Sequence, residues 1–204
     1  PILADRRRAP RDDVISGLVL ADADGHRLTD EEILSNVRLL FTAGASTTVD
    51  ALGNLLYALL SDRSRWEAVC TTSTLRAGAI EELLRWETPV AILPRMSASE
   101  PVEFAGVEIP PGSFCLFAAT AANRDPAVFD DPHRYDLHRD VGSRLLSFGP
   151  GPRLCPGMHL ARKQLAVVLD VLIERLPGLQ LSDPQAAQPS GTVLRGPVTL
   201  PVRY

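Results

Sequence analysis

The chain has 204 residues, of which 45% are hydrophobic and 23% are charged, and its net charge is −4. This balance is typical of a globular protein with a sizeable core. The acidic excess argues against a nucleic-acid-binding protein, which normally carries a basic excess. No apolar run approaches the roughly 20 residues needed to cross a bilayer, so we expect no membrane partner. The cysteines at positions 70, 115 and 155 fit no zinc spacing, and a reducing cytoplasm is the expected location.

The strongest helical signal covers residues 29–60. Thr29 followed by Glu32 is a capping-box pattern, and apolar residues then recur with helical spacing. One continuous helix of this length would be about 48 Å long and would span a whole domain. Its middle, residues 43–48, carries small and hydroxyl-bearing side chains, and Gly44 there costs about 1 kcal/mol relative to alanine. This composition indicates that something lies close against the backbone.

The prolines are concentrated after Pro89, so helices should give way to turns and short strands. The expected elements are helices at 64–69 and 75–87, a β-hairpin formed by 102–109 and 113–118, irregular chain at 123–156, a helix at 157–176 and short strands at 177–204. The hairpin is predicted because two alternating segments flank Pro110-Pro111-Gly112. The predicted fold class is therefore mainly α with a small β component.

The most informative segment is the cysteine loop, residues 148–157, which reads FGPGPRLCPG. Its glycines and prolines specify a rigid backbone path that leads directly into a helix. Cys155 is therefore expected at a helix N-terminus, where free N–H groups and the helix dipole favour a thiolate. A thiolate on a glycine-rich loop suits an iron ligand, because glycine lets the backbone approach a flat macrocycle. The alternative, a buried structural cysteine, requires neither the flanking glycines nor Arg153.

The cysteine loop resembles the haem-binding signature of the cytochrome P450 family. The matching residues are Phe148, Gly151, Arg153, Cys155 and Gly157, and the helix that follows also looks like the family's at Leu160-Ala161-Arg162. The resemblance extends over essentially the whole chain. It implies that residues 1–204 form one partial domain, the C-terminal haem-binding half of a bacterial-type enzyme whose N-terminal half is absent.

The resemblance implies a role for each of several residues. Cys155 would bind the iron of haem b, and Thr47 would hydrogen-bond dioxygen at that iron. The residues implied to contact the cofactor are Ala43, Gly44, Thr48, Arg95, Ser147, Phe148, Gly149, Arg153, Gly157 and Ala161. Arg95 and Arg153 would hold the two propionates. Glu82, Arg85 and Arg139 would form a buried triad that holds the cysteine loop and takes no part in the chemistry.

Ser46 is the main departure from the family pattern within the long helix. It stands where an acid usually relays protons, and a hydroxyl is a poor proton donor at neutral pH. We therefore expect weaker coupling of oxygen reduction to substrate oxidation. The alternative is that the small residues here merely allow close helix packing.

The implied reaction is insertion of one oxygen atom from O2 into an organic substrate. Electrons would come from a ferredoxin or flavodoxin-type donor with its reductase. The donor would dock near Cys155, where positive charge is expected from Arg144, Arg153, Arg162 and Lys163. Two alternatives remain: a truncated, non-catalytic haem-binding fragment, and a peroxide-using relative, which the serine at position 46 suggests.

Overall fold

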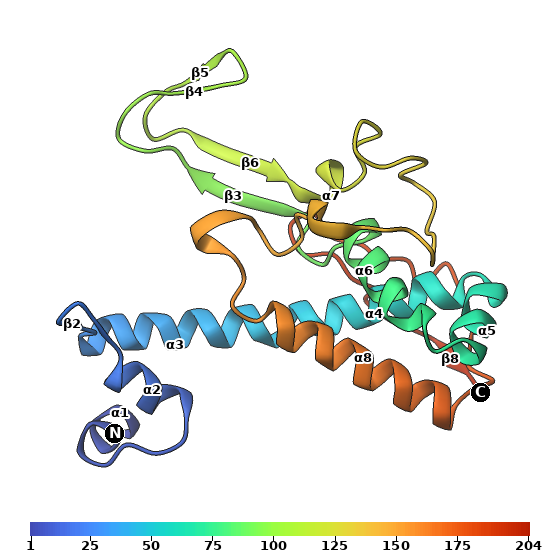
Figure 1. Ribbon diagram of the computed structural model, residues 1–204, viewed down its shortest axis with the longest axis horizontal. Helices are drawn as coiled ribbons and strands as arrows, with labels where there is room; N and C mark the ends of the chain where they lie inside the picture. Colours follow the sequence, from blue (N-terminus) through green and yellow to red (C-terminus); the bar gives the residue numbers. More distant parts are fainter. The chain divides into compact units, whose positions relative to one another are not determined.

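The computed structural model describes residues 1–204, apart from the side chain of Ala23. The chain divides into two compact units, Pro1–Ser46 and Thr47–Tyr204. The helices, drawn in Figure 1, are α1 (Ile2–Arg8), α2 (Val14–Leu20), α3 (Asp30–Ala45), α4 (Thr47–Leu60), α5 (Arg63–Thr71), α6 (Leu75–Trp86), α7 (Ala119–Ala122) and α8 (Met158–Arg175), with 3-10 turns η1 (Gly142–Arg144) and η2 (Gly151–Arg153). The strands are β1 (Asp22–Ala23), β2 (His26–Arg27), β3 (Ile92–Met96), β4 (Val102–Phe104), β5 (Val107–Ile109), β6 (Phe114–Ala118), β7 (Gln180–Leu181) and β8 (Val202–Arg203). The mainly α prediction with a small β component is confirmed.

Two helices of the N-terminal unit, α2 and α3, have N-terminal ends that are capped by side chains. Asp13 caps α2 by accepting a hydrogen bond from the backbone N–H of Ser16 at 2.8 Å. The predicted capping box at the start of α3 is confirmed. The Glu32 N–H donates to Thr29 Oγ1 at 3.3 Å, and the Thr29 N–H donates to Glu32 Oε2 at 2.8 Å. These caps satisfy backbone donors that have no partner within the helix.

The prediction of one helix over residues 29–60 was wrong at Ser46. Helix α3 ends at Ala45, α4 begins at Thr47, and Ser46 between them has φ −109° and ψ −35°. Glycine and hydroxyl-bearing residues are weak helix formers, and serine side chains compete for backbone hydrogen bonds. The small residues near position 46 therefore weaken the helix where the apolar periodicity alone predicted continuity.

The core of the C-terminal unit lies among α4, α5, α6 and α8. Helices α4 and α8 each contribute leucines at helical spacing, and Trp66 of α5 is fully buried. The indole N–H of Trp66 donates to the carbonyl of Pro177 at 2.9 Å, so the tryptophan also ties the chain after α8 to the core. The most fully buried apolar side chains are Leu55, Leu59, Trp66, Val69, Leu83, Leu165 and Leu169.

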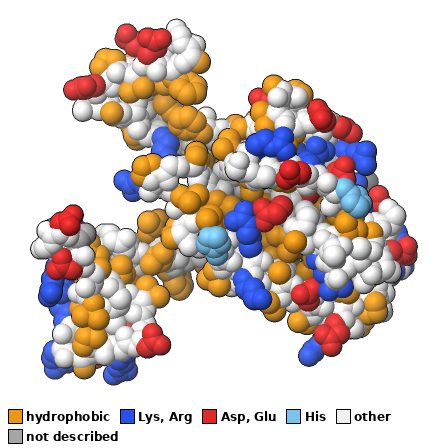
Figure 2. All heavy atoms as spheres, in the orientation of Figure 1, with side chains coloured by type: hydrophobic (Ala, Val, Ile, Leu, Met, Phe, Trp, Pro, Cys, Tyr) orange, Lys and Arg blue, Asp and Glu red, His pale blue; other side chains and the backbone are white. Residues whose placement is uncertain are grey.

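The predicted β-hairpin around Pro110-Pro111-Gly112 was wrong. Strand β4 pairs instead with β5, through a turn in which Ala105 has φ 51° and Gly106 has φ 77°. Two successive positive φ angles give the tight turn whose twist matches antiparallel strands. Strand β6 pairs with β3, with Arg95 opposite Cys115. Figure 1 shows the β4–β5 hairpin beyond the β3–β6 sheet, and Figure 2 shows hydrophobic side chains at its surface.

The boundaries of three further helices agree closely with the sequence prediction. Helices α5, α6 and α8 begin and end within two residues of the predicted positions. Residues 123–156 contain only the two 3-10 turns, and short strands β7 and β8 pair near the C-terminus. None of the helices in the described part of the chain combines the length and the apolar character needed to span a membrane.

Candidate functional site

The cysteine loop is shaped by its own backbone. The N–H of Cys155 donates to the carbonyl of Phe148 at 2.9 Å, and the N–H of Leu154 donates to the carbonyl of Gly151 at 3.0 Å. Gly149 and Gly151 have φ angles of 71° and 77°, which side-chain-bearing residues rarely adopt. The glycines are therefore required for the path that delivers Cys155 to the start of α8.

Cys155 presents a free thiol at this point. The residue is half-buried and forms no disulfide. A Cβ added at Gly157 would lie 3.8 Å from the Cys155 sulfur, so the absence of a side chain there keeps one approach to the sulfur open. Burial raises the pKa of the Cys70 thiol, because removal from water disfavours the thiolate.

Asn123 anchors the residues that directly precede the cysteine loop, and one of these residues is bonded to α6. Its side-chain amide donates to Ser147 Oγ at 2.9 Å, and its side-chain carbonyl accepts from the N–H of Leu146 at 2.9 Å. Ser147 Oγ in turn donates to the carbonyl of Leu84. Asn123 is fully buried, so these bonds are shielded from water. Sequence reasoning missed this residue, because one asparagine after a short helix is a common cap.

The structure brings Glu82, Arg85 and Arg139 together. Arg85 forms two hydrogen bonds with the Glu82 carboxylate, each 2.7 Å long, and Arg139 Nε lies 3.1 Å from Glu82 Oε1. The side chains of Glu82 and Arg85 are both 0% exposed. Arg85 also donates to the backbone carbonyl of Asn123 at 3.0 Å, and Asn123 holds the residues that precede Cys155. The triad and the cysteine loop are thus joined through one residue.

A second brace joins α6, α8 and the loop. Arg162 binds both oxygens of Glu81, at 2.6 and 2.9 Å, and its guanidinium lies 4.6 Å from the ring centroid of Phe148. The hydrogen bond to Glu81 raises the pKa of Arg162. Because Glu81 neutralises Arg162, this arginine adds little to the positive surface expected near Cys155. Arg144 is exposed and donates to backbone carbonyls, and Arg153 and Lys163 are exposed.

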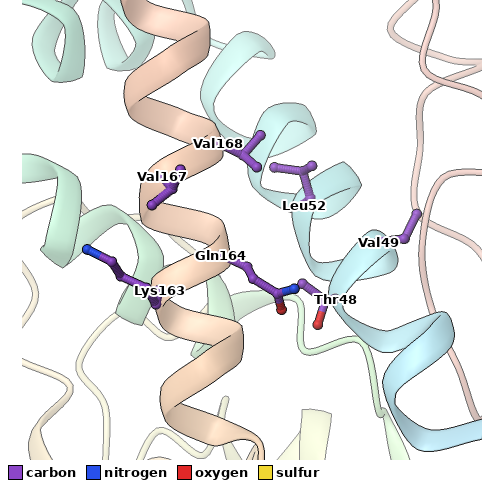
Figure 3. A pocket seen from close by; sticks show the side chains of 7 residues that line it. All are labelled: Thr48, Val49, Leu52, Lys163, Gln164, Val167 and Val168. Atoms are coloured by element: carbon purple, nitrogen blue, oxygen red, sulfur yellow. The ribbon is translucent and has the colours of Figure 1, made fainter. Parts of the chain in front are cut away.

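The first turns of α4 face α8 across a groove. Thr48, Val49 and Leu52 line it from α4, and Lys163, Gln164, Val167 and Val168 line it from α8, around a volume of about 330 Å³. Figure 3 shows Thr48 and Gln164 pointing toward one another, with Leu52 opposite Val168. Thr47 and Thr48 are both half-buried.

The other predicted site residues are placed as follows. Arg95 lies on β3, is exposed, and donates to the carbonyl of Pro94 at 2.8 Å. Ala161 lies in the first turn of α8, where its N–H donates to the carbonyl of Gly157 at 2.9 Å. Ala43 and Gly44 lie in the last turn of α3, in the N-terminal unit, and a Cβ added at Gly44 would have no neighbour within 4 Å. Packing among the described residues therefore does not explain the glycine at position 44.

The sequence model of the family described as cytochrome P450 matches residues 74–199, which include the triad and the cysteine loop. The chain belongs to the cytochrome P450 family. It is 38% identical to the cytochrome P450 monooxygenase PikC of Streptomyces venezuelae over 206 residues, which cover 100% of this chain and 49% of PikC. It is 35% identical to the steroid C26-monooxygenase of Mycolicibacterium smegmatis, covering 100% of this chain and 50% of that protein.

Solved cytochrome P450 structures have the same fold as this chain. The structure of CYP109Q5 from Chondromyces apiculatus aligns with a TM-score of 0.92 at 38% identity, covering 99% of this chain and 52% of that one. CYP109E1 from Bacillus megaterium in complex with testosterone aligns with a TM-score of 0.90 at 33% identity, covering 99% and 56%. The chain thus spans about half the length of the cytochrome P450 proteins that it matches.

Membership of the cytochrome P450 family implies a haem cofactor, and the residues present fit that group. Cys155 supplies one accessible sulfur on a loop whose glycines lack Cβ atoms. Among the described residues, Arg95 and Arg153 form no ion pair with a carboxylate, so their guanidinium groups can bind the carboxylates of a ligand. A free thiol and unpaired guanidinium groups are the kinds of donor that a haem with acidic side groups would need.

Proposed function

We propose that residues 1–204 are the C-terminal, haem-b-binding portion of a cytochrome P450 monooxygenase. The reaction is insertion of one oxygen atom from O2 into an organic substrate, with electrons from a ferredoxin or flavodoxin-type donor and its reductase. The observation that carries the proposal is the connected path from the buried triad through Asn123 to the loop of Cys155. The monooxygenase names of PikC and the steroid C26-monooxygenase support the reaction class.

Each residue of the site has a distinct part in this proposal. Thiolate-ligated haem supplies the reduction of O2 and cleavage of its O–O bond. Cys155 binds the iron, and the hydrogen bonds of its loop fix the sulfur in place. Arg95 and Arg153 bind the propionates, and Thr47 at the start of α4 holds a proton for transfer to oxygen. Glu82, Arg85 and Arg139 hold the cysteine loop in position.

The electron donor would dock near the cysteine loop. Lys163 is exposed and among the described residues forms no ion pair, so it can attract an acidic partner, whereas Arg153 is assigned to a propionate in this proposal. Arg162 is already bound to Glu81 and is excluded from this role. The described cysteines are free thiols, as expected for a protein of the reducing cytoplasm. We propose that the electron donor is found in the same compartment.

Exposed apolar residues support a further part of the protein covering this chain. On α3, Leu39, Leu40 and Phe41 are 63%, 42% and 77% exposed. Leaving such side chains in water forgoes about 1.5–3 kcal/mol each. We therefore expect residues 1–204 expressed alone to aggregate and to hold haem weakly. A monomer with sharp near-ultraviolet circular dichroism and stoichiometric haem would contradict this expectation.

The decisive experiment replaces the proposed iron ligand in the haem-loaded full-length form. The reduced carbon monoxide complex should show the red-shifted Soret band of thiolate-ligated haem, and Cys155→His should move the band to the position of imidazole-ligated haem. Cys70→Ser is the matched control and should leave the spectrum unchanged, since Cys70 packs against the core. An unaltered band in Cys155→His would rule out the assignment.

A peroxide-using enzyme is the second candidate, and Ser46 is the observation that favours it. Peroxide already carries the electrons and protons that the O2 reaction must import, so a weak proton relay would matter less. Turnover with hydrogen peroxide but not with reductant and O2 would favour this candidate. A haem-binding protein that its redox partners cannot reduce would instead be a non-catalytic fragment.

A further inference from the structure

One face of α4 holds the chain segment 195–197. The side-chain amide of Asn54 donates to the carbonyl of Arg195 at 3.0 Å. A Cβ added at Gly53 would lie 2.7 Å from Pro197 Cγ, so only glycine allows this approach. Asp50 completes the face, because a Cβ added at Gly196 would lie 2.7 Å from Asp50 Oδ1. The carboxylate of Asp50 therefore packs directly against the backbone of the segment.

Asp50 is half-buried, and few polar contacts offset the free-energy cost of removing its carboxylate from water. Among the residues that the structure describes, it takes part in none of the hydrogen bonds or ion pairs. Burial raises the pKa of Asp50, because removal from water disfavours the charged form. The carboxyl group can therefore keep its proton at a higher pH than an exposed aspartate.

The charged groups on the elements packed around Asp50 are already paired or point elsewhere. Arg195, next to Gly196, binds Glu87 at 2.5 Å, and Glu87 also binds Arg124 at 3.1 Å. Lys163 of α8 lines the groove with Thr48, Val49 and Leu52, whereas Asp50 lies against Gly196. A positive charge next to Asp50 would stabilise its anion, and among the described residues no cation forms an ion pair with Asp50.

The proposed reaction needs a proton source. Conversion of a substrate RH and O2 into ROH and water consumes two electrons and two protons. The electrons come from the redox partner, and the protons must reach the bound oxygen from a group that can release them. The hydroxyls of Ser46 and Thr47 can pass a proton but are too weakly acidic to supply it. Asp50 is the acidic residue in the first turn of α4.

We propose that Asp50 is a proton-relay residue that supplies protons for oxygen activation through Thr47. The two residues are three positions apart on α4 and so share a helix face. The proton leaves the Asp50 carboxyl group, passes through water to Thr47 Oγ1 and on to the reduced oxygen, and solvent then reprotonates the half-exposed carboxylate. The inference rests on the proposed monooxygenase function, and it places an acidic group four residues after Ser46 in the sequence.

The first test compares variants of the haem-loaded full-length form. Asp50→Asn keeps the shape of the side chain but removes the transferable proton, so product formed per reductant consumed should fall by about tenfold or more, with more peroxide released. Adding Ser46→Asp to Asp50→Asn should restore most of the lost coupling, which a merely structural role of Asp50 would not allow. Asp170→Asn, which removes an exposed carboxylate on α8, is the matched control and should couple like the unmodified protein.

The second test measures the protonation of the Asp50 carboxyl group in the absence of turnover. In the reduced carbon monoxide form, with 13C-labelled aspartate, the carboxyl signal that disappears in Asp50→Asn should titrate above the ordinary aspartate pKa of about 3.9. Titration at or below that value would overturn the inference. If Asp50→Asn loses haem, Asp50→Ser takes its place in both tests.

The outcomes separate the inference from the function on which it rests. If the unmodified protein lacks the thiolate Soret band, the proposed function fails and the relay fails with it. If the band is present and Asp50→Asn couples as well as the unmodified protein, the relay alone is wrong.

Discussion

The two compact units of the chain are stabilised by different means. In Thr47–Tyr204, large apolar side chains such as Trp66 and Leu83 are fully buried, and so are the charged Glu82 and Arg85. In Pro1–Ser46, the buried residues among the described side chains are Ser16, Val19 and Ile33. The N-terminal unit depends instead on helix caps and partly exposed ion pairs. The N-terminal unit therefore depends mainly on polar contacts, whereas the C-terminal unit depends on the burial of large side chains.

The difference between the two units predicts which of them unfolds locally first. Burial of one large apolar side chain contributes about 1.5–3 kcal/mol, whereas an exposed ion pair contributes about 0–1 kcal/mol. Backbone amides of the N-terminal unit should consequently exchange with solvent before those of α4, α6 and α8. The substitutions below test this difference from the largest expected effect to the smallest.

Arg85→Ala should cause the largest loss, because it leaves the buried Glu82 carboxylate without its closest partner. Breaking a buried ion pair from one side typically costs about 3–5 kcal/mol. The free energy of unfolding, measured by urea titration, should fall by this amount, and haem should be retained poorly. Arg134→Ala is the matched control, because that side chain is 65% exposed and lies 3.7 Å from Asp136, and its effect should be close to zero. Equal effects would mean that burial does not distinguish these two arginines.

Glu87→Gln should cost less than Arg85→Ala. The Glu87 side chain is 8% exposed, but Arg124 and Arg195 are 23% and 29% exposed, so water and salt screen the pairs. We expect a loss of about 1–2 kcal/mol in the same urea titration. High salt should reduce the difference between Glu87→Gln and the unmodified protein, and it should leave the Arg85→Ala difference largely unchanged. The opposite salt dependence would reverse the proposed ranking of the two sites.

Thr29→Ala tests the N-terminal unit, where caps replace the core. Removing the hydroxyl that accepts from the Glu32 N–H should destabilise α3 by about 1 kcal/mol. Hydrogen exchange in the first turn of α3 should accelerate, while exchange in α6 stays the same. Thr42→Ala, an exposed change in the same helix, is the control and should leave that first turn protected. Faster exchange in both units would indicate that they unfold together.

The smallest effect concerns the cap of α2. The backbone N–H of Ser16, followed by the guanidinium of Arg6, lowers the pKa of Asp13 from 3.8 to about 2. Because the folded pKa lies below the unfolded one, the stabilisation is complete above about pH 4 and is lost as the pH falls toward 2. Exchange of the Ser16 amide, corrected for its intrinsic pH dependence, should rise over this interval. Asp13→Asn should show no such rise, and a rise in that variant would point to another group.

Local sequence determined the parts of the molecule that depend on near neighbours. The capping box at Thr29 follows from two side chains three residues apart, and so does the pairing of Glu82 with Arg85. The family could be inferred from the cysteine loop because proline restricts φ and glycine allows positive φ wherever these residues occur. The boundaries of α5, α6 and α8 followed from apolar periodicity and from the prolines that end helices.

Tertiary structure decided what depends on residues far apart in the chain. The pairing of β6 with β3 could not be predicted from the alternation of either strand, because alternation does not specify a partner. Asn123 became the link between the triad and the cysteine loop only when α6 and residues 146–147 were brought together. Asp50 likewise is an ordinary first-turn acid until residues 195–197 pack against it and remove water. In both cases the sequence supplies the polar group, and burial by distant segments gives it its role.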